Sequence, residues 1–253
     1  MDTDFIYKIK NIKKSFSKDS GTNIPTLQFK DLFVRRGSMT IITGETGIGK
    51  TTLLNMLGLM DEIEFYDNDD IFFIPEPNHP FISYKELYQN SPEEIENIRF
   101  EYFGFMFQQD HLIDSMTGWE NVILPCLLRY PGISVQEAAL RAKNIIRDCK
   151  FNDMLDGLMN RSPSTFSGGQ RQRAALIRAL IHDPIAIFAD EPLASVDYNT
   201  ALEIIRILYK QTLYGKTIIM VVHDTHEVMF ENIEVEKIHL TKRFFQNTKR
   251  RGE

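Results

Sequence analysis

The sequence has little cysteine and no long apolar run. Only two of its 253 residues are cysteines, Cys126 and Cys149, which are too few for the disulfide framework of a secreted fold and fit a reducing compartment. The longest apolar runs, such as residues 218–222, are far shorter than the roughly 20 residues that a membrane span needs. The first residues hold no apolar stretch followed by small residues, so we expect no signal peptide. These absences predict a soluble, cytoplasmic protein.

An excess of positive charge is lacking as well. The chain has 29 lysines and arginines against 35 acidic residues, which gives a net charge of -6 and a pI near 5.6. This balance argues against a dedicated nucleic-acid binder, although a local basic patch remains open. With 43% hydrophobic and 25% charged residues, the composition excludes a disordered chain. The length fits one large domain, or a core with a subdomain.

Apolar runs of two kinds alternate along the chain. Continuous apolar runs flanked by turn residues, as buried parallel strands show, cover 38–44, 184–190 and 216–224. Residues 6–12 alternate between apolar and polar, like a half-buried strand. Apolar residues at helical spacing cover 51–60, 171–181 and 199–211. This alternation of strands and helices predicts a doubly wound α/β core.

Two regions fit that scheme less well. Residues 62–100 contain an acidic stretch, a proline-rich turn and then a helix that we expect to be capped by Ser91. Residues 117–160 are mainly helical in pattern and lie between two core strands. We therefore predict an inserted helical subdomain over 110–165, within a single domain that spans 1–253. The basic tail from 242 onward is predicted to be loose at its end.

The sharpest local signal is GETGIGKT, which begins at Gly44 and matches G-x-x-x-x-G-K-[ST]. It follows a predicted strand and opens a predicted helix, so its backbone N–H groups and the helix N-terminus can cradle phosphates. Lys50 would reach the β- and γ-phosphates, and the Thr51 hydroxyl would hold Mg²⁺. The alternative is a glycine-rich turn that binds nothing. The predicted nucleotide-binding residues are Gly44, Glu45, Thr46, Gly47, Ile48, Gly49, Lys50, Thr51 and Thr52.

A second element, IAIFADE, ends in Asp190 and Glu191. Acids that end a buried strand lie at the carboxyl edge of the sheet, where open α/β sheets bind ligands. Asp190 would bind Mg²⁺, and Glu191 would polarise the attacking water. Taken alone, this acid pair could equally be a helix cap or a surface turn. Together with the phosphate loop, it predicts a nucleoside-triphosphate hydrolase.

A third element, TFSGGQ, precedes a strong helical pattern and resembles the LSGGQ signature of the ATP-binding cassette (ABC) ATPases. A hydroxyl, bare amides and a helix N-terminus form a second anion site, although a plain helix cap is the alternative. The resemblance explains why one chain has two such sites. In that family, the signature of one subunit covers the γ-phosphate held by its partner. The resemblance therefore assigns an in-trans role to Ser167, Gly168, Gly169 and Gln170.

The resemblance assigns roles to further residues. Gln108 corresponds to the Q-loop glutamine, which contacts Mg²⁺ and the water, with Gln109 leaving a one-residue ambiguity. Asp197, in LASVD, corresponds to the D-loop and would reach across the dimer. His223 matches the switch histidine that bonds the γ-phosphate. Phe16 lies where the family stacks an aromatic ring on adenine, unless it is ordinary core packing.

The resemblance covers roughly residues 5–240. It points to the subgroup that powers lipoprotein release, macrolide export and the cell-division ABC complex, because of residues 51–61 and 104–125. It implies a P-loop NTPase (RecA-like) core with a mainly parallel sheet, an N-terminal antiparallel β region and the helical subdomain. Two parts depart from the family pattern. Residues 62–90 lack its usual compact hairpin, and the part after His223 lacks its strand–Asp-Gly hairpin.

The resemblance further implies what the protein does. Two subunits, identical or different, would close over two ATP·Mg²⁺ and drive a separate membrane permease from the cytoplasmic face. The implied catalytic residues are Lys50, Gln108, Glu191 and His223, and the implied Mg²⁺ ligands are Thr51, Gln108 and Asp190. The alternative is a soluble ABC ATPase that acts on nucleic acid or ribosomes through its basic tail.

Overall fold

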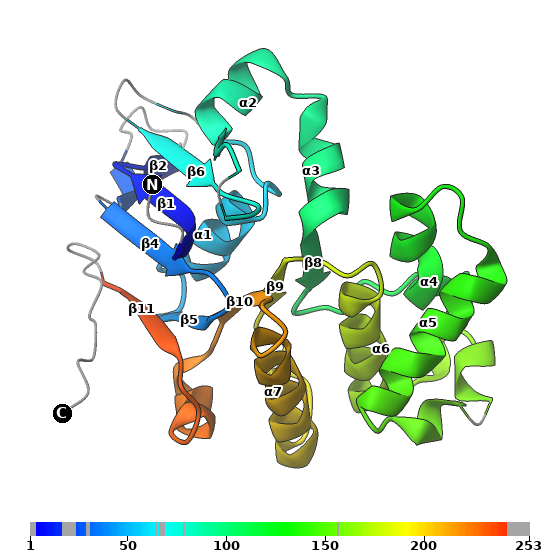
Figure 1. Ribbon diagram of the computed structural model, residues 1–253. Helices are drawn as coiled ribbons and strands as arrows, with labels where there is room; N and C mark the ends of the chain where they lie inside the picture. The colour runs from blue at the N-terminus through cyan, green and yellow to red at the C-terminus, as the bar shows by residue number, and fades with distance from the viewer. Residues whose placement is uncertain are drawn as a thin grey trace.

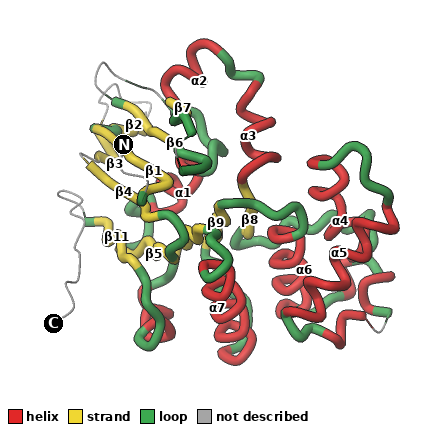
Figure 2. Tube along the Cα trace, viewed as in Figure 1, coloured by secondary structure: helices red, strands yellow, loops and turns green. Residues whose placement is uncertain are grey.

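The computed structural model describes residues 4–16, 24–28, 31–63, 65, 69–77, 79–155 and 157–241 (Figure 1). A parallel sheet lies at the centre, with helices on both of its faces, and an antiparallel β region stands to one side of it (Figures 1 and 2). The predicted α/β class with a mainly parallel sheet and an N-terminal antiparallel region is confirmed. The basic tail beyond residue 241 and the side chain of Phe16 lie outside the described part of the chain.

The parallel sheet has the strand order β11-β5-β10-β9-β8. Each neighbouring pair is parallel, so the carboxyl ends of these strands meet at one edge. All residues of β5 and β10 are buried, which explains why their sequences read as continuous apolar runs. The five strands are β5 (Met39–Gly44), β8 (Phe103–Met106), β9 (Ala186–Asp190), β10 (Thr217–Val221) and β11 (Glu236–Leu240).

The antiparallel region consists of two sheets in the described chain. A four-stranded sheet has the order β4-β1-β6-β7, and a two-stranded sheet pairs β2 with β3. The bounds are β1 (Phe5–Lys10), β2 (Lys13–Phe16), β3 (Ile24–Gln28), β4 (Asp31–Arg35), β6 (Asp70–Phe73) and β7 (Ile82–Ser83). Tyr7 of β1 ties this region to the core, because its hydroxyl donates to the carbonyl of Leu57 at 3.0 Å.

Two apolar clusters cover the two faces of the parallel sheet. Alternate residues of β10 supply one cluster each, with Ile218 and Met220 on one face and Ile219 and Val221 on the other. On one face lie α1 (Lys50–Leu57) and the antiparallel region, and on the other lie α6 (Gly168–Leu180) and α7 (Tyr198–Thr212). The sheet is therefore a rigid platform held between two cores.

Residues 62–102 contain two short helices, α2 (Tyr84–Asn90) and α3 (Glu94–Tyr102). The prediction that Ser91 caps the helix in SPEEIENI is wrong. Ser91 instead ends α2, and its N–H donates to the carbonyl of Leu87 at 3.0 Å. The side chain at the start of α3 makes no capping hydrogen bond. Ser83 is the true N-cap here, because it accepts the N–H of Glu86 at the start of α2.

A helical block lies at the far side of the molecule from the antiparallel region (Figure 1). Its helices α4 and α5 each begin with a capping box, Thr117 with Glu120 and Ser134 with Glu137, which satisfies two orphan donors at each start. Both helices pack against α6. The block contains α4 (Gly118–Arg129), α5 (Val135–Asp148), and the 3₁₀ turns η1 (Asn152–Leu155), η2 (Leu158–Asn160) and η3 (Pro163–Thr165).

Both cysteines are buried in or beside this block and neither forms a disulfide. Burial raises the pKa of the Cys149 thiol to about 12, so it stays protonated and inert at neutral pH. Within the described ranges, every helix is too short or too polar to cross a membrane.

Candidate functional site

The loop after β5 is shaped by glycines. Gly44 has a φ of 136°, and a Cβ there would lie 2.5 Å from the carbonyl oxygen of Leu240, so any other residue would force β5 and β11 apart. Gly49 has a φ of 106° and stands at the N-cap of α1 without a side-chain cap. The first N–H groups of α1 therefore remain available to an anion.

Lys50 lies under this loop and is 6% exposed. Its ammonium donates to the carbonyl of Gly44 at 2.6 Å and to that of Glu45 at 3.2 Å. These bonds hold the ammonium beside the glycine-shaped loop and the start of α1. The loop residues predicted from the sequence, 44–52, thus form a concave turn with a cation and a helix N-terminus, which is a cradle suited to polyphosphate.

Thr51, the next residue of α1, faces the end of β9. Its hydroxyl donates to Oδ1 of Asp190 at 2.9 Å. Burial raises the pKa of the Asp190 carboxyl, the charge of Glu191 adds to this effect, and the Thr51 hydrogen bond opposes it. A bound dication would relieve that unfavourable burial of charge. A hydroxyl and a carboxylate beside a phosphate cradle are the hard oxygen ligands that Mg²⁺ takes together with phosphate oxygens.

Glu191 follows Asp190 and adopts a φ of 42°, which is uncommon for a residue with a side chain. Its N–H donates to the carbonyl of Val221 at 3.2 Å, so this turn is tied to β10. Oε2 of Glu191 accepts a hydrogen bond of 3.2 Å from Nε2 of Gln108. Gln108 lies just beyond β8, the strand next to β9, so neighbouring strand ends bring the two side chains together.

His223 follows β10 at the same edge of the sheet. Its ring is exposed, and Nδ1 lies 3.1 Å from the hydroxyl of Thr225, which fixes the ring at the start of the 3₁₀ segment η4 (Asp224–Phe230). No cluster of three histidine, cysteine, aspartate or glutamate side chains suitable for a metal occurs among the described residues. The Thr51–Asp190 pair offers two hard oxygen atoms, which fit a Mg²⁺ ion that would take its other ligands from phosphate and water.

The signature residues lie on a different element from the phosphate loop. Ser167 is the N-cap of α6. Its hydroxyl accepts the N–H of Gln170 at 3.3 Å, and Oε1 of Gln170 accepts the N–H of Ser167 at 2.9 Å. Helix α6 packs against β8, α4, α5 and α7, whereas α1 packs against β5, β9 and β10. Ser167 thus acts as a helix cap, as the alternative interpretation held, and also presents a second helix N-terminus.

Asp197 caps a helix too. Its carboxylate accepts the N–H groups of Asn199 and Thr200 at 3.0 and 3.1 Å, and the hydroxyl of Thr200 at 2.6 Å, at the start of α7. These hydrogen bonds lower the pKa of Asp197, with the largest effect from the Thr200 hydroxyl and smaller effects from the N–H groups. The sequence-based prediction for Phe16 concerns a side chain outside the described residues; its backbone pairs with Ile24 between β2 and β3.

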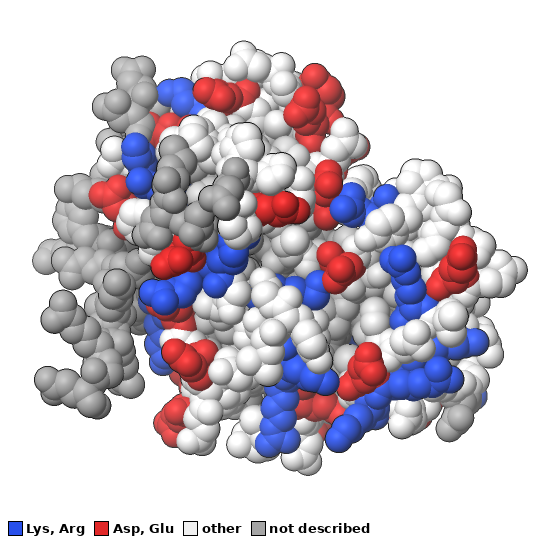
Figure 3. All heavy atoms as spheres, viewed as in Figure 1, with Lys and Arg blue, Asp and Glu red and all other residues white. Residues whose placement is uncertain are grey.

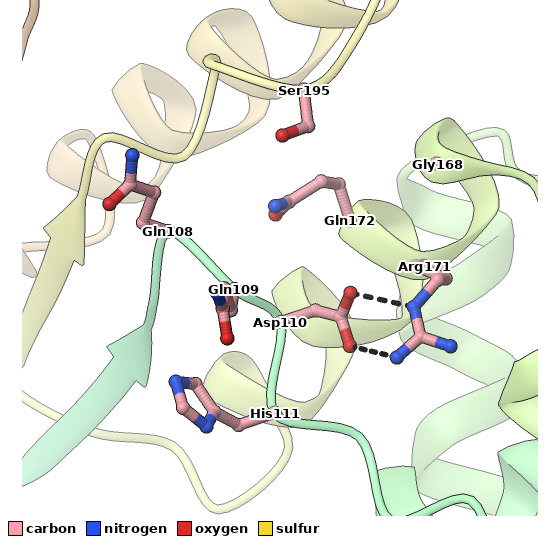
Figure 4. Close-up of a pocket in the computed structure, with 8 residues that line it drawn as sticks. All are labelled: Gln108, Gln109, Asp110, His111, Gly168, Arg171, Gln172 and Ser195. Carbon is pink, nitrogen blue, oxygen red and sulfur yellow. Dashed lines mark hydrogen bonds and ion pairs between the residues drawn. The ribbon is translucent and has the colours of Figure 1, made fainter.

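The structure also brings together charged residues that the sequence reasoning missed. Asp110 and Arg171 form a two-bond ion pair between the segment after Gln108 and the first turn of α6 (Figure 4). The opposite charges of Asp110 and Arg171 were the only hint in the sequence that they pair. No spacing rule predicts contact between residues that lie so far apart in the chain. Beside the pair lies a cavity of about 350 Å³ lined by Gln108, Gln109, Asp110, His111, Gly168, Arg171, Gln172 and Ser195.

A glycine-shaped phosphate cradle, a buried lysine, and a hydroxyl–carboxylate pair at the carboxyl edge of a parallel sheet define a P-loop nucleoside-triphosphatase. The family can be stated as well. Residues 27–194 match the family model described as ABC transporter, and the chain belongs to this family. It is an ATPase domain of the ABC type, and ATP with Mg²⁺ is the substrate that such domains take.

Named relatives agree with this assignment. The chain is 35% identical over 221 residues to the macrolide export ATP-binding/permease protein MacB of Chlorobaculum tepidum. This match covers 86% of this chain but 30% of that protein. It is 33% identical over 224 residues to the uncharacterized ABC transporter ATP-binding protein MJ0796 of Methanocaldococcus jannaschii, covering 88% of this chain and 89% of that one. The predicted likeness to the macrolide-export subgroup is thereby confirmed.

A solved structure shows the same architecture. The dimeric structure of MJ0796 in a post-hydrolysis state bound to ADP and Pi has a TM-score of 0.80 and 29% identity, and covers 98% of this chain and all of that one. The chain thus spans about a third of the length of the macrolide exporters that it matches but the whole of a separate cassette.

Proposed function

We propose that two cassettes of this kind close over two ATP·Mg²⁺, each nucleotide lying between the phosphate loop of one subunit and Ser167–Gln170 of the other. One observation carries this proposal. In the described part of the chain, the helix N-termini of α1 and α6 are both suited to phosphate, and they are anchored to different parts of the fold. A second subunit gives the second N-terminus a phosphate to bind. The solved structures of the similar cassette MJ0796 are dimers, which supports a two-subunit arrangement.

We assign the chemistry to residues at the sheet edge. Glu191 accepts a proton from the attacking water, and Gln108, already bonded to it at 3.2 Å, holds that carboxylate and the water in place. Lys50 and the amides of residues 44–51 stabilise charge on the γ-phosphate, and His223 bonds it from β10. Mg²⁺, held by Thr51 and Asp190 with Gln108 nearby, neutralises the phosphate oxygens when bound. Asp197 of each subunit reaches toward the other.

The work of closure and opening is proposed to move a membrane permease. The named exporters are ATP-binding/permease proteins, and this chain matches 30% of the length of one of them. We place the cassette at the cytoplasmic face of the membrane, with residues 110–165 as a helical subdomain beside the permease. The partner cassette is a second copy or a related chain.

The alternative function, work on nucleic acid or ribosomes, has less support. On the face of the molecule in Figure 3, acidic and basic side chains are interspersed, whereas a nucleic-acid surface has a continuous basic patch. The basic tail falls outside the described residues. Both the family match and the relatives named above concern transporters.

A mixing experiment tests the proposed composite site. Lys50→Met removes the phosphate-loop cation but leaves the signature intact. Ser167→Asp keeps a good helix cap but places a negative charge against the partner's γ-phosphate. Each variant alone should lose ATP hydrolysis, and an equimolar mixture should recover it, because mixed dimers contain one intact composite site. A mixture as inactive as its components, or full activity of Ser167→Asp alone, would refute the proposal.

A further inference from the structure

The segment after Gln108 is attached to the signature helix by a planar ion pair. Nε of Arg171 donates to Oδ2 of Asp110 at 2.7 Å, and Nη2 donates to Oδ1 at 2.8 Å (Figure 4). Two parallel bonds fix direction as well as distance. The side chains are only 14% and 26% exposed, so water competes less with this pair than with an open surface pair.

A second arginine of α6 holds the backbone of the same segment. Arg178 lies two turns beyond Arg171 on the same face of the helix, and it donates to the carbonyls of His111, at 2.7 Å, and Asp110. Arg171 also donates to the carbonyl of Pro163 at 2.8 Å, in the turn before the signature. Residues 110 and 111 are therefore anchored to α6 through both side chain and backbone.

These contacts connect two chemically important ends. Arg171 follows Gln170 in the first turn of α6, whose N-cap is Ser167. Asp110 lies two residues after Gln108, which bonds Glu191 at 3.2 Å. A continuous series of contacts thus runs from the helix end that faces the partner's nucleotide to the carboxylate that activates water in the chain's own site.

Beside the ion pair, the two elements are not packed together. A cavity of about 350 Å³ separates Gln108 and Gln109 from the first turn of α6. Gln172, 3% exposed, lies beside it, and its Oε1 has no hydrogen-bond partner among the residues that the structure describes. Because space rather than packing fills this junction, polar contacts attach the Gln108 segment to α6. The Asp110–Arg171 pair does so at the first turn, and the backbone bonds of Arg178 do so two turns further on.

We infer that Asp110 and Arg171 are positioning residues that make the signature helix and Gln108 move as one body, so that ATP bound by the partner controls how Gln108 holds Glu191. The inference rests on the composite site proposed above and adds a route by which the two sites of a dimer act cooperatively. Neither residue belongs to the phosphate loop or to Ser167–Gln170. Their effect is on turnover and cooperativity rather than on ATP affinity.

The test compares Asp110→Asn, Arg171→Gln and the double variant, with Asp153→Asn as the matched control. Asp153 also faces an arginine of α6, Arg173, at 3.2 Å, and its hydrogen bonds in the described part of the chain go to Arg173 and not to the Gln108 segment. We expect each single variant to lower kcat about 10-fold or more, as displaced catalytic groups do, with ATP affinity within about twofold. The Hill coefficient for ATP should fall toward 1. The double variant should match the singles, because the pair acts as a unit.

Asp153→Asn should behave like the wild type. If Asp110→Asn melts at a clearly lower temperature than the wild type, Arg171→Lys is tested in its place. Lysine keeps the positive charge but cannot form the two parallel bonds. This variant should show a smaller drop in kcat with the same loss of cooperativity. Wild-type kcat and Hill coefficient in folded variants would overturn the inference, as would additive effects in the double variant. The Lys50 and Ser167 mixing experiment is unaffected by that outcome, so failure of the two proposals can be told apart.

Discussion

The hydroxyl of Thr51 donates a 2.9 Å hydrogen bond to the carboxylate of Asp190, although the two residues are 139 positions apart. The contact joins the first turn of α1 to the end of β9. It shows that the phosphate loop and the acidic strand end, which the sequence presents as separate motifs, form one site. The contact therefore brings together two of the oxygen atoms that the proposed Mg²⁺ site requires.

This contact leads to a prediction for Thr51. Thr51→Val keeps the shape of the side chain but removes the oxygen, so ATP hydrolysis should fall by about 10²-fold or more and addition of Mg²⁺ should no longer tighten nucleotide binding. Thr51→Ser keeps the hydroxyl and should retain most of the activity. Fluorescent-nucleotide titrations with and without Mg²⁺ measure the difference. Equal Mg²⁺ dependence in Thr51→Val and the wild type would remove Thr51 from the metal site.

Glu191 is predicted to act in catalysis and not in binding. Glu191→Gln keeps the size of the side chain but cannot accept a proton, so kcat should fall by roughly 10²–10⁴-fold. ATP binding should persist, and the variant should accumulate as an ATP-bound dimer, visible by size-exclusion chromatography. A variant that hydrolyses ATP at the wild-type rate would show that another group is the base.

The elements that could be predicted from sequence are those specified by local signals. The buried strands β5, β9 and β10 read as continuous apolar runs, and GETGIGKT combines its turn glycines with a strand before it and a helix after it. The predicted cap of α3 was wrong. Ser91 has the right residue type for an N-cap, but it ends the preceding helix α2, which Ser83 begins.

The parts that escaped prediction depend on pairs of distant residues. Asp110 and Arg171 each look like ordinary surface charges, and only the packing of α6 against β8 brings them together. Asp197 carries a D-loop motif, yet its contacts within the chain are those of a helix cap. Sequence motifs locate such residues but do not reveal what each touches, because that depends on tertiary packing.

Gly104, in β8, is predicted to allow the close packing of β8 against α6. A Cβ there would lie 2.2 Å from the carbonyl oxygen of Ala179 in α6, and backbone cannot move aside as a flexible side chain can. Gly104→Ala should therefore lower the free energy of unfolding by about 1–3 kcal/mol. ATP hydrolysis should fall too, since β8 leads to Gln108. Gly132→Ala is the control: nothing lies within 4 Å, so urea unfolding should show a change below about 0.5 kcal/mol. Equal midpoints for the two variants would contradict this account.

His182 should make the fold sensitive to mild acid. The side chain is 5% exposed, and Nε2 lies 2.9 Å from the carbonyl oxygen of Phe103, an acceptor, so Nε2 carries the proton. Burial lowers the pKa of His182 below its ordinary 6.5. The unfolded chain therefore takes up a proton at a higher pH than the folded protein does, and stability must fall as pH drops below about 6.5.

His182→Gln keeps an N–H donor for Phe103 but cannot titrate, so its free energy of unfolding should fall less between pH 7 and pH 5 than that of the wild type. The two proteins are compared first at pH 8, where the histidine is neutral in both folded and unfolded chains and any difference reflects packing alone. Urea unfolding at each pH then isolates the contribution of the ring. If both proteins lost the same stability on acidification, the proton would be taken up elsewhere in the chain, and burial of His182 would not be the cause.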